Sequence, residues 1–249
     1  VRCDHCYRHP VLHARPGRNR SLNAVEQRMI SRPGTDPILR FAVLACILVT
    51  TALMVEATAL YPGGSMLDVR SVGFDWSKNF FSNLFQERAI NGATNPGRPW
   101  ALVGMAFHSL GDGLFFIRMS RVILHKHSTR VLKVVGISNI AFNFMIATPF
   151  HDAMVTTSST LSLLGLFYIT VFIIRTKLHV LKVCCVAFML VAYFTLFLYG
   201  TGNWGLLAIM QKAATISSAL LVLGLTFFTA AEDFEGGVPK MDTGAGASA

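Results

Sequence analysis

Charged residues are scarce in this chain, and that scarcity argues against a soluble fold. Asp, Glu, Lys and Arg make up only 14% of the 249 residues, whereas soluble domains usually contain about 25%. The deficit is concentrated in long apolar runs, and the mean hydropathy is +0.51. Such runs are typical of membrane proteins. We therefore expect an all-α, polytopic transmembrane bundle with the lipid bilayer as its surroundings.

Acidic residues are the scarcer of the two charged classes, which leaves a net charge of +9. A strongly basic chain can indicate nucleic-acid binding when the charge covers one soluble face. Here Lys and Arg lie between the apolar runs, where they determine membrane topology. The sequence therefore excludes nucleic acid as a partner.

The five cysteines do not form a disulfide framework. Three of them, Cys46, Cys184 and Cys185, lie within apolar runs, where cysteine behaves as a small hydrophobic residue. The other two belong to the N-terminal tail.

Residues 1–35 are polar and basic without a hydrophobic period, so we expect a disordered basic tail. The loop between its potential zinc-ligand pairs is too short for a zinc finger, and we predict no metal site there. Either these Cys and His residues occur together by chance, or residues 1–28 precede a true start at Met29 and do not belong to the mature protein. The four potential ligands are Cys3, Cys6, His9 and His13.

Six apolar segments are each long enough to cross a hydrocarbon core of about 30 Å. Together they predict a transmembrane domain over 36–231, followed by a disordered Gly/Ala-rich tail over 232–249. The expected spans are 38–60, 99–121, 131–150, 153–174, 179–199 and 205–230.

The distribution of Lys and Arg predicts the orientation of the spans. The N-terminal tail and the connections after the second and fourth spans are basic, whereas the connections after the third and fifth spans contain no Lys or Arg. By the positive-inside rule, both termini are expected on the cytoplasmic side of the membrane.

The loop 61–98 is too long to be a simple connection. Within it, apolar residues such as Trp76, Phe80 and Phe81 recur at helical spacing, which predicts an amphipathic helix over 75–89. Such a helix belongs at the membrane interface, either as a lid over the bundle or as an anchor for the loop. Ser82 lies on its polar side.

Polar residues inside a span are costly and therefore indicate a functional site. His108 and Asp112 are four residues apart on one helical face and suit proton transfer, metal ligation or a structural hydrogen bond. Asn139 and Asn143 have the same spacing on the next, antiparallel helix. They are expected to pair with Asp112 and His108 respectively, mainly as structural hydrogen bonds.

Two further pairs of residues complete the candidate site. His151 and Asp152 precede a run of Ser and Thr, which suggests either a base and nucleophile or a hydrophilic vestibule. Glu56 and Lys212 lie at similar depths and could form an ion pair. We expect these groups to line one polar cavity that opens outward.

Two stretches, Ala59-Leu60-Tyr61-Pro62-Gly63-Gly64 and Asn79-Phe80-Phe81-Ser82-Asn83-Leu84-Phe85, carry a family resemblance. They resemble the segment that follows the first helix in the domain-of-unknown-function 998 family of bacterial membrane proteins. The resemblance covers the first two helices and implies a six-helix fold in a bacterial plasma membrane, without assigning a chemistry.

A second resemblance is to the alkaline ceramidase-related membrane hydrolases, through Ser82-Asn83 and through Phe107-His108 followed by Asp112. It implies a zinc-dependent hydrolase. However, that family has seven helices and a late His-x3-His pair that this sequence lacks.

Three functions remain open from the sequence. The chain binds or transports a small molecule through an outward polar cavity, with His108 and Asp112 as proton-linked groups. Alternatively, it is a hydrolase acting on lipid, or a structural or accessory protein whose polar residues only hold helices together. The sequence leaves open whether it is an enzyme and which cofactor it uses.

Overall fold

The computed structural model describes residues 36–235. The predicted tail 1–35 and residues 236–249 of the predicted tail 232–249 lie outside the described residues, whereas the first residues of the latter, Glu232–Glu235, form a short helix. Within this range the fold is all-α, and β-pairing is limited to two isolated bridges in the long loop. The long helices are α2 (Pro37–Ala59), α3 (Arg98–Val122), α4 (Lys126–Met145), α5 (His151–Ile173), α6 (His179–Thr201) and α7 (Trp204–Phe228), with a short α8 (Glu232–Glu235) at the end.

The six long helices match the six predicted spans within a few residues at most boundaries. Five of them, all except α4, are long and apolar enough to cross a membrane. The helix α4 contains Lys126, Arg130 and Lys133 in its first two turns, which lowers its apolar content. It also starts five residues before the predicted span at 131. The model therefore supports a membrane-embedded helical bundle.

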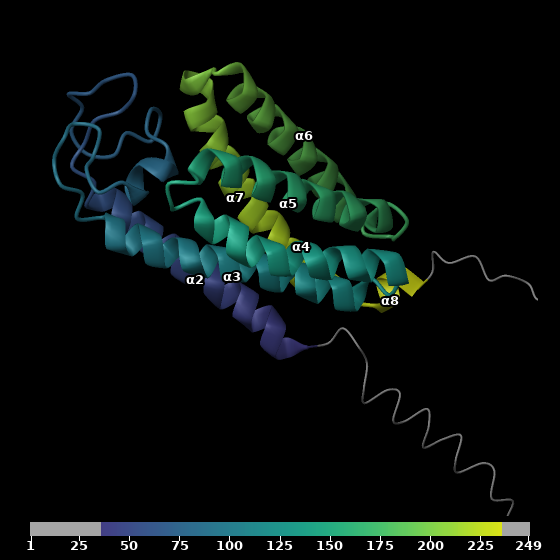
Figure 1. The fold of residues 1–249 in the computed structure, drawn as a ribbon. Helices are drawn as coiled ribbons and strands as arrows, with labels where there is room; N and C mark the ends of the chain where they lie inside the picture. Colours follow the sequence, from purple (N-terminus) through teal and green to yellow (C-terminus); the bar gives the residue numbers. More distant parts are fainter. Residues whose placement is uncertain (1–35, 236–249) are drawn as a thin grey trace, which may run out of the picture. The chain divides into compact units, whose positions relative to one another are not determined.

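Successive helices run antiparallel, and α3 is the most connected of them (Figure 1). It packs along α2 on one side and α4 on the other, while α4 packs on α5 and α6 on α7. Its glycines permit these close approaches, since a Cβ on Gly111 would lie 2.8 Å from the Cβ of Cys46, and one on Gly113 would lie 2.7 Å from the carbonyl oxygen of Gly136. A Cβ on Gly104 would meet Leu53 and Met54, so Gly104 and Gly111 both lie close to α2.

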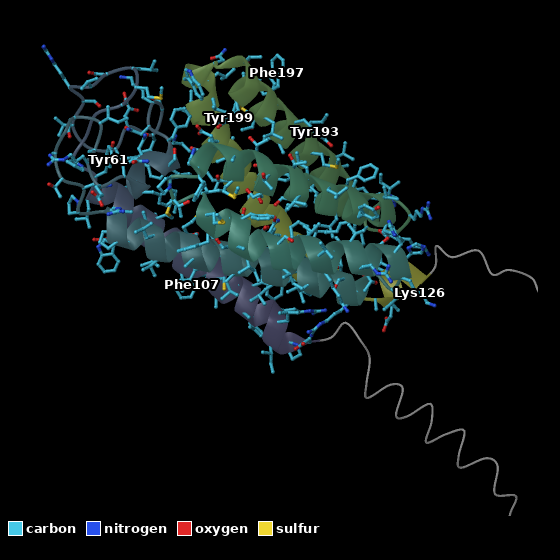
Figure 2. All side chains as sticks on the ribbon, viewed as in Figure 1. Tyr61, Phe107, Lys126, Tyr193, Phe197 and Tyr199 are labelled. Atoms are coloured by element: carbon cyan, nitrogen blue, oxygen red, sulfur yellow. The ribbon has the colours of Figure 1, made fainter. Side chains whose placement is uncertain are left out.

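Large apolar side chains cover the outward faces of the helices, as expected where lipid replaces water. Phe197 and Tyr193 project from α6 and are 61% and 51% exposed (Figure 2). A bundle in water would bury most of these residues, so the exposed apolar faces agree with embedding in a bilayer.

The ends of the bundle differ in composition. We call one the loop end, because it contains the long loop 60–97 and the connections 146–150 and 202–203. The other we call the basic end, with the connections 123–125 and 174–178 and the segment 229–235. An apolar cluster that includes Tyr61, Leu84 and Met105 fills the loop end, and a larger one around Phe115 and Leu225 fills the basic half.

The prediction of an amphipathic helix over 75–89 is wrong in both the length and the type of the helix. Only a five-residue 3-10 helix, η1 (Phe81–Phe85), forms there. The physical reason is competition from asparagine side chains, which satisfy backbone N–H groups in place of helical carbonyls. Asn79 Oδ1 accepts from Asp75 N at 2.9 Å, and Asn83 Oδ1 accepts from Phe80 N at 2.7 Å.

The long loop is instead held by a glycine turn. Gly63 and Gly64 both have positive φ, and a Cβ on Gly64 would lie 2.4 Å from the backbone nitrogen of Asn91. The side-chain amide of Asn79 donates to Gly64 O at 2.7 Å. The two stretches that carry the first family resemblance are therefore in direct contact.

Candidate functional site

Asp112 occupies the middle of α3 and is the centre of a polar group that joins three helices. It lies 14 residues after Arg98, or about 21 Å along the helix axis at 1.5 Å per residue. Its Oδ2 accepts hydrogen bonds from the side-chain amides of Asn139 and Asn143 in α4, both at 3.0 Å. The predicted contact between Asp112 and Asn139 is therefore present.

Asn139 extends this group to α5. Its Nδ2 also donates to Ser162 Oγ at 2.7 Å. Asn139 is fully buried, and its Oδ1 is one of the few buried side-chain atoms in residues 36–235 that lack a hydrogen-bond partner. Sequence reasoning missed Ser162 because it belongs to a long run of Ser and Thr and nothing in its spacing distinguishes it.

His108 lies one turn before Asp112 and is exposed on the surface of α3. It is close enough to Asp112 to interact electrostatically. The predicted pairing of His108 with Asn143 is wrong, because Asn143 donates to Asp112 instead. The two asparagines therefore converge on one carboxylate oxygen and do not form two stacked pairs.

His151 and Asp152 form a second polar group at the loop end. Asp152 Oδ1 accepts from His151 Nδ1 at 2.9 Å and from the hydroxyl of Tyr199 in α6 at 3.1 Å. Tyr199 was not predicted, although the antiparallel connection places the last turn of α6 beside the first turn of α5.

Three threonines of the hydroxyl run after Asp152 bond to their own helix. Thr156, Thr157 and Thr160 each donate to the carbonyl oxygen four residues earlier in α5. The hydroxyls thus satisfy their own helix, which favours the vestibule interpretation over the base and nucleophile.

Lys212 forms a third group, where α7 meets the long loop. It is 7% exposed, and its ammonium donates to the backbone oxygens of Asn79 and of Ala208. It also lies 5.7 Å from the ring centroids of both Phe74 and Phe81, within the range of cation–π contacts. The neighbouring Gln211 accepts from Phe81 N at 3.1 Å.

The predicted pair between Glu56 and Lys212 does not form. Glu56 is exposed on α2, whereas the contacts of Lys212 are with the loop. Ser82 lies in η1 with a half-buried side chain. Within the described part of the chain, the hydrogen bonds of these candidate residues form separate groups around Asp112, Asp152 and Lys212. The single polar cavity expected from their depths stays a prediction.

Sequence reasoning also missed Arg118 at the basic end. Its guanidinium is buried and donates to Leu225 O at 3.2 Å and to Thr229 O at 2.8 Å. These carbonyls belong to the last turn and C-cap of α7, where a cation is favoured by the helix dipole. A mainly apolar pocket lies at the same end, lined by Ile123, Leu124, His125, Lys126, Phe172, Ala231 and Phe234.

The donor set does not fit the zinc centre that the hydrolase resemblance implies. Over residues 36–235, no group of three or more His, Cys, Asp or Glu side chains is placed to hold a metal ion. Asp112 is instead surrounded by amide and hydroxyl groups, which are weak ligands for zinc.

Comparisons with protein-family models, with curated proteins and with solved structures gave no match.

Proposed function

We propose that this membrane protein binds or transports a small molecule, and that Asp112 is the polar centre of its pathway. One observation carries the proposal: a carboxylate in the middle of a spanning helix has its hydrogen bonds from the neutral amides of Asn139 and Asn143. Ionisable groups at this depth are expensive and mark binding sites or proton pathways. A purely structural contact between α3 and α4 would need only neutral side chains.

His108 gives this centre a proton-linked partner. Imidazole changes its charge near neutral pH, and His108 is exposed one turn from the carboxylate. A proton can therefore pass between His108 and Asp112, which lie one turn apart on α3. In this role the two residues couple binding at the centre to protonation.

The proposed orientation places the loop end outside and both termini in the cytoplasm. The basic end supports it, because cytoplasmic segments are enriched in Lys and Arg. The residues concerned are Arg118, Arg121, Lys126, Arg130, Lys133, Arg175, Lys177 and Lys182. Kinship with the domain-of-unknown-function 998 family is likewise proposed, on the two loop stretches that Asn79 joins.

The test is a ligand screen on protein in nanodiscs, read as a shift in thermal unfolding. The panel contains amino acids, sugars, nucleosides and phospholipids, and compares wild type with Asp112→Asn. Asn keeps the size of the side chain and an acceptor for the two amides but removes the charge. Ser217→Ala is the matched control, because Ser217 is half-buried on α7 and its hydrogen bonds stay within its own helix.

We expect at least one compound class to stabilise wild type and Ser217→Ala but not Asp112→Asn. In proteoliposomes containing a pH-sensitive dye, the same compound should change the internal pH, and His108→Ala should slow that change. An equal stabilisation of Asp112→Asn would contradict the role of the carboxylate. No stabilisation by any class would favour a structural bundle.

A further inference from the structure

Two arginines converge on one backbone oxygen at the basic end of the bundle. Thr229 O, at the C-cap of α7, accepts hydrogen bonds from Arg118 Nη2 at 2.8 Å and from Arg40 Nη2 at 3.5 Å. Arg118 is 2% exposed, and Arg40, near the start of α2, is half-buried. The two guanidinium groups lie within electrostatic reach of each other. Like charges in such a site repel each other and need a compensating negative charge.

The described part of the chain does not supply that charge. No carboxylate in residues 36–235 forms an ion pair with either guanidinium. Asp36 pairs with Arg121, and Asp233 Oδ2 accepts a hydrogen bond from Ala230 N at 2.8 Å. The carbonyl groups at the C-terminus of a helix are equivalent to only about half a negative charge. More than one positive charge therefore stays uncompensated where α2, α3 and the end of α7 meet.

Unused donors show that the pair can accept an anion. The Nε atoms of Arg40 and Arg118 are both buried and lack a hydrogen-bond partner, although buried donors are normally satisfied. The only hydrogen bond that Arg40 makes within the described residues is the long one to Thr229 O. Most of its N–H donors are therefore available to a ligand. Because Arg40 is only half-buried, an anion can reach its side chain from the surroundings.

The position of the pair favours a phosphate group as this anion. Arg40 is the fourth residue of α2 and Arg118 lies four residues before the end of α3, so each is about 5–6 Å from a helix end at 1.5 Å per residue. A spanning helix meets the headgroup layer of the bilayer at that level. The planar guanidinium binds phosphate oxygens through paired hydrogen bonds, and basic pockets between spanning helices bind lipid headgroups.

We propose that Arg40 and Arg118 form a binding site for a phosphate group at the basic end of the bundle. Two sources supply this chemistry, the headgroup of an anionic phospholipid and free inorganic phosphate. The bound phosphate accepts hydrogen bonds from both guanidinium groups and offsets their repulsion. It thereby stabilises the contact of α2 with α3 and with the end of α7, at a site separate from the one around Asp112.

The experiment separates the two sources by their effects on thermal unfolding of the full chain in nanodiscs. One set of nanodiscs contains phosphatidylcholine alone, whose choline carries a positive charge that opposes binding beside arginine. The other set contains phosphatidylcholine mixed with phosphatidylglycerol. Sodium phosphate is titrated into the first set against sodium chloride at equal ionic strength. Native mass spectrometry of protein released from the mixed nanodiscs detects retained phosphatidylglycerol.

Two variants each remove one guanidinium from the pair, namely Arg40→Gln and Arg118→Gln. Arg121→Gln is the matched control, because it removes one positive charge from the same end at an exposed residue that pairs with Asp36. If Arg118→Gln does not fold, Arg40→Gln carries the comparison. Its loss of contacts within the described residues is limited to one long hydrogen bond.

We expect one of the two sources to stabilise wild type and Arg121→Gln to a degree that grows with its concentration. Arg40→Gln should weaken that binding about tenfold or more, as expected for the loss of a charge-assisted hydrogen bond. Stabilisation by phosphatidylglycerol, with its retention in mass spectrometry, would identify a lipid headgroup as the ligand. Stabilisation by sodium phosphate in phosphatidylcholine would identify free phosphate.

Two results would overturn the phosphate site. The first is wild type that neither source stabilises. The second is an equal response of Arg40→Gln and Arg121→Gln, because the effect would then reflect only the overall positive charge of the basic end.

Discussion

The ammonium of Lys212 in α7 donates a hydrogen bond to the backbone oxygen of Asn79, 133 residues earlier in the chain. Asn79 in turn donates to Gly64 O, so one chain of bonds connects the last long helix to the glycine turn of the long loop. A buried ammonium satisfied by carbonyl oxygens and aromatic rings thus fastens the loop to the bundle.

Replacing Lys212 by Met should loosen the loop. Met is similar in length but leaves the buried oxygen of Asn79 without its donor, which costs about 1–3 kcal/mol. Hydrogen exchange should then increase at the backbone N–H of Phe81, which bonds to Gln211. Lys177→Met, at an exposed position of the basic end, is the control and should change neither quantity. Unchanged exchange at Phe81 would contradict the fastening role.

The glycine turn yields a second prediction through two matched positions. Gly64 and Gly92 have nearly equal φ values of +85° and +87°, but a Cβ on Gly64 would meet Asn91, whereas one on Gly92 has nothing within 4 Å. Gly92→Ala should therefore cost only the backbone strain of about 1–3 kcal/mol. Gly64→Ala should add an overlap penalty of about the same size.

Chemical denaturation in detergent measures both glycine variants, and limited proteolysis of the loop gives an independent readout. The expected order of stability is wild type, then Gly92→Ala, then Gly64→Ala. Equal losses in the two variants would show that the loop can move away from the added methyl group at Gly64.

The sequence predicts the bundle well because hydropathy is a local property. Long apolar runs determine the existence and approximate ends of α2, α3, α5, α6 and α7. The contact of Asp112 with Asn139 also follows from counting residues along two antiparallel helices.

What the sequence does not predict is the rotation of each helix about its axis and the path of the long loop. Depth alone pairs Lys212 with Glu56, but rotation directs Lys212 to the loop. The periodic apolar residues of 75–89 indicate a helix. However, the side chains of Asn79 and Asn83 accept hydrogen bonds from backbone N–H groups there and compete with the helical pattern. Tyr199 and Arg118 meet partners on distant helices, and no spacing in the sequence reveals such contacts.

The loop should respond to acid through Asp75. The side-chain and backbone hydrogen bonds from Ser77, with Lys78 nearby, hold the pKa of Asp75 below its usual value. A lowered pKa in the folded state means that the carboxylate stabilises the loop above its ordinary pKa of about 3.9 and loses that effect as pH falls through the folded value. Asp75→Asn should therefore weaken the loop at neutral pH, and its difference from wild type should vanish in acid.

Fluorescence of the adjacent Trp76 reports this change in a background with Trp100→Phe and Trp204→Phe. Asp36→Asn, located before α2 at the basic end, is the control and should leave the signal of Trp76 unaltered at every pH. A constant difference between Asp75→Asn and wild type across the whole pH range would contradict a role for the ionised carboxylate.

The basic end gives a last prediction, which separates a buried arginine from an exposed one. Arg118 is 2% exposed and donates from two nitrogens to the carbonyls of Leu225 and Thr229. Arg121, three residues later, is exposed and pairs with Asp36 at 2.8 Å. Lysine keeps the charge at either position but cannot reproduce the planar arrangement of several N–H donors.

Arg118→Lys should therefore lower the free energy of unfolding by about 1.5–3 kcal/mol, the range for hydrogen bonds that involve a charged group. Arg121→Lys should change it by less than about 1 kcal/mol, because exposed ion pairs contribute little. Denaturant titration of both variants, with hydrogen exchange at the end of α7, measures the difference. If both variants lost the same stability, the positive charge alone would account for the role of Arg118. The directed hydrogen bonds of its guanidinium to the end of α7 would then add no stability.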